Sequence, residues 1–235
     1  MNKLDTHADY YLGETQDIQE RFTTKATIEL MLPYCKNKSV LTLGLGNGKL
    51  IEAISKTCKT QHVIEGSQGI IDKFWKNFKN STVECNFFEK VSTQQKFDVI
   101  LANHVLEHVD DAKNLLRNTL SKLMNKQTKL LITVPNAKSL HRQIGVEMGL
   151  LNSIFDLNPS DYAAGHQRVY DIDRLFEDIK VGGLNISKHG GYNLKLVSLA
   201  QMKEWDNDLL EAIFQVSKSQ TTDICANLWV LATKC

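Results

Sequence analysis

The sequence predicts an α/β protein built on one largely parallel sheet, and three observations carry this prediction. Short β-rich runs alternate with helical stretches from about residue 39 to the end of the chain, which is the pattern of a sheet with helices between its strands. The first β-rich run ends directly in a glycine-rich turn that opens a helix. The 235 residues are 42% hydrophobic and 23% charged, a composition typical of globular domains with their own core.

Each element is expected from its local pattern. We expect seven strands, at residues 39–43, 62–65, 82–85, 97–101, 129–134, 184–188 and 226–233. Helices are expected at residues 49–58, 69–78, 111–124, 139–149, 171–179 and 199–216. The apolar positions of residues 17–32 predict an amphipathic helix, so residues 1–38 form an N-terminal helical cap. Residues 146–170 interrupt the alternation, and long insertions usually carry function; the chain is expected to be one domain, 1–235.

Charge and cysteine content exclude several classes of protein. The chain has 28 Lys and Arg against 27 Asp and Glu, a net charge of +1, which disfavours nonspecific binding to nucleic acid or anionic membrane. No apolar run approaches the roughly 18 residues of a membrane span, and the N-terminus is polar where a signal peptide is apolar. The five cysteines are odd in number, with no C-x-x-C pair, so neither a disulfide framework nor a zinc knuckle is indicated. We expect a cytoplasmic protein.

A glycine-rich turn follows the first predicted strand, in the segment SVLTLGLGNGKLIEAI. Gly44, Gly46 and Gly48 stand where glycine lets the backbone turn sharply and approach a ligand closely. After roughly 20 residues a second strand ends in Glu65, as expected when a carboxylate accepts hydrogen bonds from a ribose diol. Taken alone, the glycines are also explained by a tight turn, and Glu65 by a cap on the next helix.

Taken together, the motifs resemble those of class I S-adenosylmethionine-dependent methyltransferases, from about Ser39 to the C-terminus. The loop LGLGNG resembles their first motif, VIEGS their acidic second-strand end, and NFFE at 86–89 the third-strand end that flanks adenine. FDVILANHVLEHVDD at 97–111 resembles their fourth-strand motif, and LLITVPNAKSLHR their fifth strand. A nicotinamide-dependent dehydrogenase is expected to have G-x-G-x-x-G, whereas here Gly48 and Lys49 follow Gly46 by two and three positions.

The resemblance implies a Rossmann-like three-layer sandwich whose seven-stranded, mostly parallel sheet has an antiparallel last strand. It implies S-adenosylmethionine as cofactor and S-adenosylhomocysteine as product. The glycines would line the methionine moiety, Glu65 the ribose, and the two phenylalanines the adenine, although one of them is expected in the core. The residues assigned to the cofactor are Gly44, Gly46, Asn47, Gly48, Glu65, Gly66, Ser67, Phe87, Phe88, Asn103 and His104. Thr42 departs from the pattern, because the family often has an acidic residue there that helps to hold the cofactor's amino group.

The segment His104-Val-Leu-Glu107-His108 also matches H-x-x-E-H, the inverted zinc-protease pattern. That motif needs both histidines on an established helix, whereas His104 lies within three residues of a strand. We therefore expect no metal here, and expect Glu107 and His108 to orient the loop. Methyl transfer to a hydroxyl needs alignment and a base of near-neutral pKa, which favours histidine. The candidate bases are His104, then His166, then His141.

The insertion and the segment after the sixth strand supply candidate acceptor-binding residues: Arg142, Arg168, Tyr170, Tyr192, Asn193 and Lys195. Two arginines and two histidines suit a phosphorylated or otherwise anionic small acceptor. An alternative is that Arg168 and Tyr170 brace the following helix. Gly190 and Gly191 are expected to form a tight turn beside the ligand.

The segments VPNAKSLHRQIGVEMGLL, GHQRVYD and GGYNLK look like those of a subgroup found in bacterial surface-polysaccharide and sugar-modification pathways. The resemblance implies O-methylation of a small acceptor that is sugar-like, phosphorylated or nucleotide-linked. The alternatives are N-methylation of an aminosugar and a catalytically inactive partner protein that binds S-adenosylmethionine. We expect no nucleic-acid or membrane partner, because the charge is balanced and the fourth motif is ANHV. Monomer and homodimer both stay open.

Overall fold

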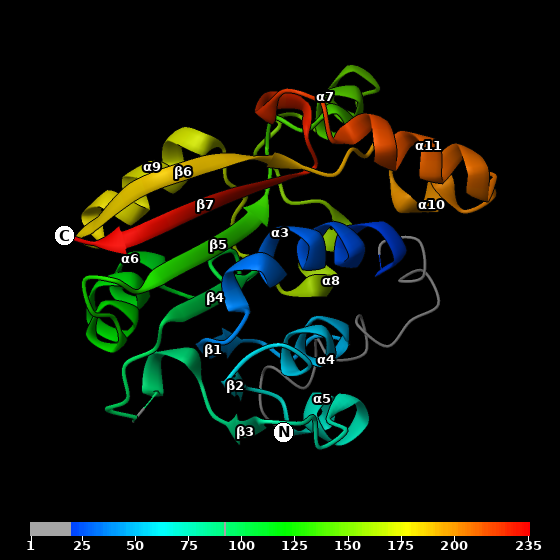
Figure 1. Cartoon of the computed structure of the whole chain (residues 1–235). Coiled ribbons are helices and arrows are strands. Elements are labelled where there is room, and N and C mark those ends of the chain that lie inside the picture. Colours follow the sequence, from blue (N-terminus) through cyan, green and yellow to red (C-terminus); the bar gives the residue numbers. More distant parts are fainter. Residues whose placement is uncertain (1–19, 92) are drawn as a thin grey trace.

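The structure, a computed structural model, describes residues 20–91 and 93–235. Seven strands form one sheet in the order β3-β2-β1-β4-β5-β7-β6. Their bounds are β1 Ser39–Leu43, β2 Thr60–Glu65, β3 Ser81–Cys85, β4 Val99–Asn103, β5 Lys129–Pro135, β6 Leu184–Tyr192 and β7 Asn227–Lys234. All neighbouring strands are parallel except at β7, which is antiparallel to both β5 and β6, and Figure 1 shows β7 running against β5. The predicted α/β fold with an antiparallel last strand is confirmed.

Helices cover both faces of the sheet because successive strand residues point to opposite sides. Leu41 and Leu43 of β1 face a core shared with the helices between β4 and β5, whereas Val40 faces a second core under α3 and α4. The α-helices are α3 Lys25–Cys35, α4 Lys49–Ser55, α5 Gln68–Phe74, α6 Ala112–Asn114, α7 Leu140–Glu147, α8 Pro159–Ala164, α9 Ile172–Val181, α10 Leu199–Met202 and α11 Asn207–Ser217. Figure 1 shows α3, α8, α10 and α11 gathered near the end toward which β4 and β5 point.

The helix predicted at 111–124 is broken into three pieces, so that prediction is wrong. After α6 come a π-helix, η3 (Leu115–Thr119), and a 3-10 helix, η4 (Leu120–Leu123). Leu115 and Leu120 are both fully buried, and the backbone N–H of Leu120 donates to the Leu115 carbonyl. This π-type bond, from residue i+5 to residue i, brings both leucines onto one face, which a regular α-helix does not do.

The glycine pair of residues 190–191 does not form a turn, because β6 continues through it to Tyr192. A Cβ on Gly190 would lie 2.7 Å from Trp229 Nε1, and one on Gly191 would lie 2.6 Å from Cys225 Cβ. The glycines are therefore needed for close packing against β7 and the segment before it. The predicted turn is corrected to a strand that carries Tyr192 to the carboxyl end of the sheet.

The N-terminal helix predicted at 17–32 falls only partly within the described residues, since 1–19 lie outside them. A π-helix, η1 (Glu20–Thr24), leads directly into α3, which continues to Cys35. The insertion contains α8, which begins with a reciprocal capping box between Asn158 and Asp161 and ends at Gly165. Among the described residues, no helix is long and apolar enough to cross a membrane.

Candidate functional site

The carboxyl ends of β2, β1 and β4 lie side by side and bring together residues distant in sequence. Leu43 of β1 pairs with Ala102 of β4, so the glycine turn after β1 is adjacent to Asn103 and His104 after β4. On the other side, Leu43 pairs with Ile64, which places Glu65 next to the same turn. Ligands bind at this edge in open α/β sheets.

The glycine turn is held in a left-handed conformation at three positions. Gly44, Gly46 and Gly48 have φ of 85°, 54° and 77°, which glycine adopts without steric cost. A Cβ on Gly48 would lie 3.1 Å from the Phe74 carbonyl oxygen, whereas the space beside Gly44 and Gly46 holds no heavy atom of the described residues within 4 Å. The turn is thus tight on its helix side and open on the side where a ligand approaches.

Glu65 ties the glycine turn to the end of β2. Its Oε2 accepts from the Leu45 N–H at 2.9 Å, and its Oε1 accepts from the Ser67 N–H at 2.9 Å. The carboxylate is 7% exposed. Each carboxylate oxygen has more than one lone pair, so Glu65 can accept further bonds from a ligand diol while it orders the turn.

The other residues predicted to contact the cofactor differ in their exposure and contacts. Phe87 is 39% exposed beyond β3, whereas Phe88 packs against the main core, as expected of one of the pair. Ser67 caps α5 by accepting from the Ile70 N–H. Asn47 accepts from the Lys49 N–H and holds the turn.

Thr42, the departure from the family pattern, is buried inside the sheet layer. It is 1% exposed, and its Oγ1 accepts from Gln61 Nε2 at 3.0 Å. Its hydroxyl is therefore occupied by an internal contact with β2, and its side chain is not available to hold a cofactor amino group as an acidic residue would.

His104 is the chemically distinctive residue at the end of β4. Its φ is 54°, a conformation uncommon for a non-glycine residue and often found at functional sites. Nδ1 lies 3.0 Å from Glu107 Oε1, and Nε2 lies 3.2 Å from the Tyr192 hydroxyl. A carboxylate only accepts, so Nδ1 carries the proton and Nε2 has the lone pair. Burial raises the Glu107 pKa, but the His104 hydrogen bond and the nearby histidines hold it below its ordinary value.

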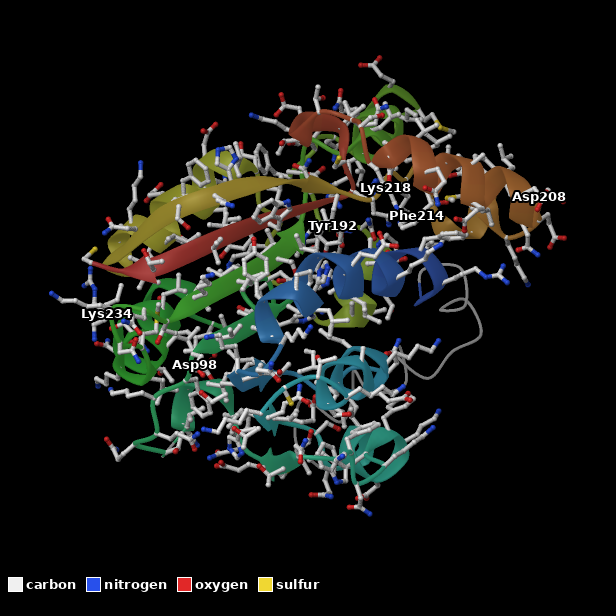
Figure 2. All side chains as sticks on the ribbon, viewed as in Figure 1. Asp98, Tyr192, Asp208, Phe214, Lys218 and Lys234 are labelled. Carbon is white, nitrogen blue, oxygen red and sulfur yellow. The ribbon has the colours of Figure 1, made fainter. Side chains whose placement is uncertain are left out.

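Tyr192 lies at the end of the edge strand β6, and its hydroxyl contacts His104, which follows the central strand β4. Burial raises the pKa of the Tyr192 hydroxyl to about 12. Figure 2 shows Tyr192 where β6 meets α11, which carries Phe214. Three threonines near the start of α3 contact both halves of the site. These contacts are Thr27 with the Tyr192 hydroxyl at 3.4 Å, Thr23 with Asn193 at 3.0 Å and Thr24 with Asn47 at 3.5 Å.

Arg142 is buried and cross-links segments of the insertion through hydrogen bonds. It is 3% exposed and donates to Asp161 Oδ2 at 3.0 Å and to the carbonyls of Ile154 and Asp156. Asp161 Oδ1 lies 3.0 Å from His166 Nδ1. Although burial raises the Asp161 pKa, bonds to His166, Asn158 and Arg142 bring it to about 2. The guanidinium is therefore a brace whose donors are occupied within the insertion, in contrast to the predicted acceptor contact.

Lys195 and His141 lie beside this brace and keep free polar groups. Burial lowers the Lys195 pKa to about 8, against the opposing effect of Asp161. Burial, with the charges of Lys195 and Arg142, holds the His141 pKa well below its ordinary value. His141 Nδ1 and Ser139 Oγ are buried without a hydrogen-bond partner among the described residues. The structure thus gathers a cation and two unsatisfied polar atoms in one place.

Arg168 and Tyr170 lie away from this group and brace the chain. Arg168 donates to the carbonyls of Leu106, Val109 and Asp110, and the Tyr170 hydroxyl donates to Asp178 Oδ2 at 2.8 Å. Both line a surface hollow of about 410 Å³ that has no lining residue from the glycine turn or the histidines. The alternative in which they brace the following helix describes Tyr170, whose partner Asp178 lies in α9, whereas Arg168 braces the segment after β4.

Sequence reasoning missed three contributors to the site. Asp161 was overlooked, although it stands five positions before His166 in PSDYAAGH, and Thr27 and Ser139 gave no signal in the sequence. Glu107 was expected only to orient the loop, yet its fully buried carboxylate directly contacts His104. The segment 104–108 is a turn and not a helix, so the zinc-protease geometry is absent from this described segment.

Curated proteins that match the chain in sequence include two kinds of O-methyltransferase. A malonyl-[acyl-carrier protein] O-methyltransferase from Bacillus cereus is 27% identical over 105 residues, 43% of this chain and 35% of that protein. A ubiquinone biosynthesis O-methyltransferase from Coxiella burnetii is 29% identical over 139 residues, covering 54% and 57% of the two chains. The chain therefore spans about a third to somewhat over half of the length of these curated relatives.

Solved structures resemble the whole chain. The N-methyltransferase NodS from Bradyrhizobium japonicum, in complex with S-adenosyl-L-homocysteine, gives a TM-score of 0.61 at 13% identity and covers 100% of this chain and 99% of that one. A putative methyltransferase complexed with the Trm112 activator from Haloferax volcanii gives 0.66 at 11% identity, covering 99% and 97%. At such identities the likeness concerns the fold.

The fold is that of class I S-adenosylmethionine-dependent methyltransferases. The chain belongs to the family described as a methyltransferase domain, whose model matches residues 17–189. S-adenosylmethionine is the cofactor, and when bound it supplies an activated methyl group. The open space beside Gly44 and Gly46 and the buried Glu65 carboxylate fit such a group.

Proposed function

We propose that this methyltransferase O-methylates a small acceptor, sugar-like or phosphorylated, in surface-polysaccharide modification. The single observation that carries oxygen methylation is the pairing of His104 with Glu107, whose Nδ1 and Oε1 atoms are 3.0 Å apart. A histidine oriented by a carboxylate is a general base suited to a hydroxyl. Nitrogen acceptors need less help of this kind.

In this proposal the two halves of the site have separate tasks. The three glycines lie against the methionine moiety, Glu65 accepts from the ribose hydroxyls, and Phe87 lies beside the adenine. Asn103 and His104 lie at the sulfonium side. The positioning of the two reactants contributes several kcal/mol to lowering the barrier.

The acceptor hydroxyl takes the place of the Tyr192 hydroxyl at His104 Nε2. His104 would remove the hydroxyl proton, and the acceptor oxygen would take the methyl group that bound S-adenosylmethionine supplies, with the carbon–sulfur electron pair staying on sulfur. Glu107 stabilises the imidazolium that forms. Nε2 is the atom that receives the proton.

The anionic character of the acceptor is supported by Lys195. Its ammonium is half-buried beside His141 and Arg142, and an anion would offset the cost of that burial. Tyr192 and Asn193 complete the proposed acceptor site. We also propose a cytoplasmic reaction, since the five cysteines are odd in number, widely spaced and without a C-x-x-C pair, as is usual in reducing compartments.

The test is a methyl-transfer screen with purified protein, S-adenosylmethionine and three acceptor sets: nucleotide-linked sugars, sugar phosphates and aminosugars. Mass spectrometry detects S-adenosylhomocysteine and locates the new methyl group on oxygen or nitrogen. O-methylation that is lost in His104→Ala and kept in His62→Ala supports the proposal, because His62 contacts only Thr82 and Glu84 among the described residues. N-methylation of aminosugars that His104→Ala leaves intact supports the N-methyltransferase alternative. Cofactor binding without transfer in any set supports the inactive partner protein.

A further inference from the structure

Three side chains of types that can bind a metal ion lie together near His104, from two distant parts of the chain. Glu107 and His108 come from the turn after β4, and His166 follows α8 in the insertion. One ligand atom from each lies within 4.8 Å of the other two. The two imidazole rings have centroids 4.8 Å apart and meet at 74°. The pairing of His108 with a distant histidine, and not with His104, is invisible in the sequence.

Glu107, a member of this cluster, has a carboxylate oxygen without a hydrogen-bond partner among the described residues. The side chain is fully buried, Oε1 contacts His104, and Oε2 has no hydrogen-bond partner among the described residues. A buried carboxylate oxygen without a partner is costly. A cation between Glu107 and the two histidines would satisfy it.

The outer contacts of both histidines are those of metal ligands. His166 Nδ1 is 3.0 Å from Asp161 Oδ1, which leaves Nε2 as the lone-pair nitrogen. His108 is hydrogen-bonded to the backbone of Gly165. Metal-binding histidines usually donate their second ring N–H to a carboxylate or a backbone carbonyl in this way. Asp161 is in turn fixed by Arg142.

We propose that Glu107, His108 and His166 bind one divalent transition-metal ion, with zinc as the best fit. Two imidazole nitrogens and one carboxylate oxygen suit zinc and related ions, whereas magnesium and calcium prefer oxygen ligands. Three protein ligands are one fewer than in a structural zinc site, so an exchangeable oxygen ligand completes the shell. The proposed metal site does not depend on the identity of the acceptor, and its test measures metal binding alone.

Binding draws the insertion toward the turn after β4. Zinc bonds of about 2.0–2.2 Å place tetrahedral ligand atoms roughly 3.4 Å apart, closer than the 4.8 Å limit that encloses them here. His166 directly follows Gly165, the residue that caps the end of α8, so a small shift at the end of α8 would bring the His166 ring to this distance. The ion would hold the insertion against the turn that carries His104.

The experiment uses tag-free, full-length protein that has been treated with a chelator and checked for folding by circular dichroism. Zinc chloride is titrated by calorimetry, cobalt chloride is followed by its visible absorption, and retained metal is counted by inductively coupled plasma mass spectrometry. We expect one ion per chain and a rise in Tm of several degrees with zinc. A folded protein that takes up neither ion at about 100-fold molar excess overturns the proposal.

Variants locate the ion. Glu107→Gln and His166→Ala should each weaken zinc binding by at least 100-fold, and Asp161→Asn by about 10- to 100-fold through the outer contact. His104→Ala should keep one bound ion, because His104 is not a ligand, and His62→Ala is the matched control. Equal binding by Glu107→Gln, or loss in His62→Ala, overturns the assignment. If a variant unfolds, the cobalt spectrum of the wild-type protein tests the assignment instead. A spectrum without imidazole coordination would contradict the proposed ligands.

Discussion

The proposed cofactor edge and the proposed acceptor edge are built in different ways. The cofactor edge is mostly backbone: three left-handed glycines and two backbone N–H groups that are held by the Glu65 carboxylate. The acceptor edge depends on side-chain pairs between distant segments, such as His104 with Tyr192 and the Arg142–Asp161 brace. A site made of backbone is specified by a few adjacent residues, whereas one made of side chains depends on the whole fold.

His104→Ala is expected to distinguish the two edges most clearly, because it should change turnover without changing cofactor affinity. Removal of the base should lower turnover by about 10²- to 10⁴-fold, while the affinity for S-adenosylhomocysteine stays nearly unchanged. Single-turnover kinetics and calorimetric titration measure the two quantities. His62→Ala is the control on β2. Full activity in His104→Ala would remove His104 from the reaction.

Arg142→Met tests whether the acceptor edge is held by an internal brace. It removes a buried partner of Asp161 and donors to two carbonyls, so the free energy of unfolding should fall by about 3 to 5 kcal/mol. Urea denaturation measures this change. Arg117→Met, at an exposed arginine that contacts the Val181 carbonyl, should change stability by less than about 1 kcal/mol. A stable Arg142→Met variant with a raised acceptor KM would instead return Arg142 to acceptor binding.

Glu65→Ala tests the cofactor edge. Loss of the charge-assisted bonds should weaken S-adenosylhomocysteine binding by about 1 to 3 kcal/mol, roughly 5- to 150-fold. Calorimetry gives the affinity, and a thermal melt reports whether the glycine turn loosens. Glu52→Ala, which removes an exposed partner of Lys56, is the charge-matched control. Unchanged affinity in folded Glu65→Ala protein would contradict the ribose assignment.

Lys195→Met should give the smallest effect of the four variants. It should raise the free energy of unfolding, whereas Arg142→Met should lower it. Burial beside Arg142, His141 and Asp161 lowers the Lys195 pKa from 10.5 to about 8, so the unfolded chain binds more protons between these pH values. Wild-type stability should therefore rise as pH increases from 8 to 10.5, and the variant should lack this rise. At pH 7 the variant should be more stable by on the order of 1 to 2 kcal/mol.

Urea melts at pH 7, 8, 9 and 10 test this prediction. Lys188→Met, at an exposed position of β6, is the control and should keep the wild-type slope. A Lys195→Met variant with the wild-type slope would show that the ammonium is solvated, and would separate Lys195 from the proposed anion site.

The cofactor edge was predictable because its signals are local. The glycines and Glu65 stand at strand ends that hydrophobic patterning locates, and parallel register brings those ends together. The roles of the arginines were not predictable. Arg142 and Arg168 look alike in sequence, yet each guanidinium is occupied by partners in other segments, and no local pattern reports such contacts.

Parts of the fold escaped prediction for related reasons. Residues 111–124 have helical composition, but the burial of both Leu115 and Leu120 favours a π-turn. The glycines of residues 190–191 are usual turn residues, yet the closeness of Trp229 and Cys225 requires glycine inside a strand. In each case tertiary packing prevails over local propensity.

The link between Tyr192 and His104 has a consequence for how the chain matures. These residues are 88 positions apart, and Thr27 and Tyr192 are 165 positions apart. Contacts that close such long loops form late, because the entropy of loop closure opposes them until the rest is in place. A chain that ends after β5 contains the residues of the glycine turn and Glu65 but lacks Tyr192. The proposed acceptor edge is therefore completed only once β6 has been synthesised.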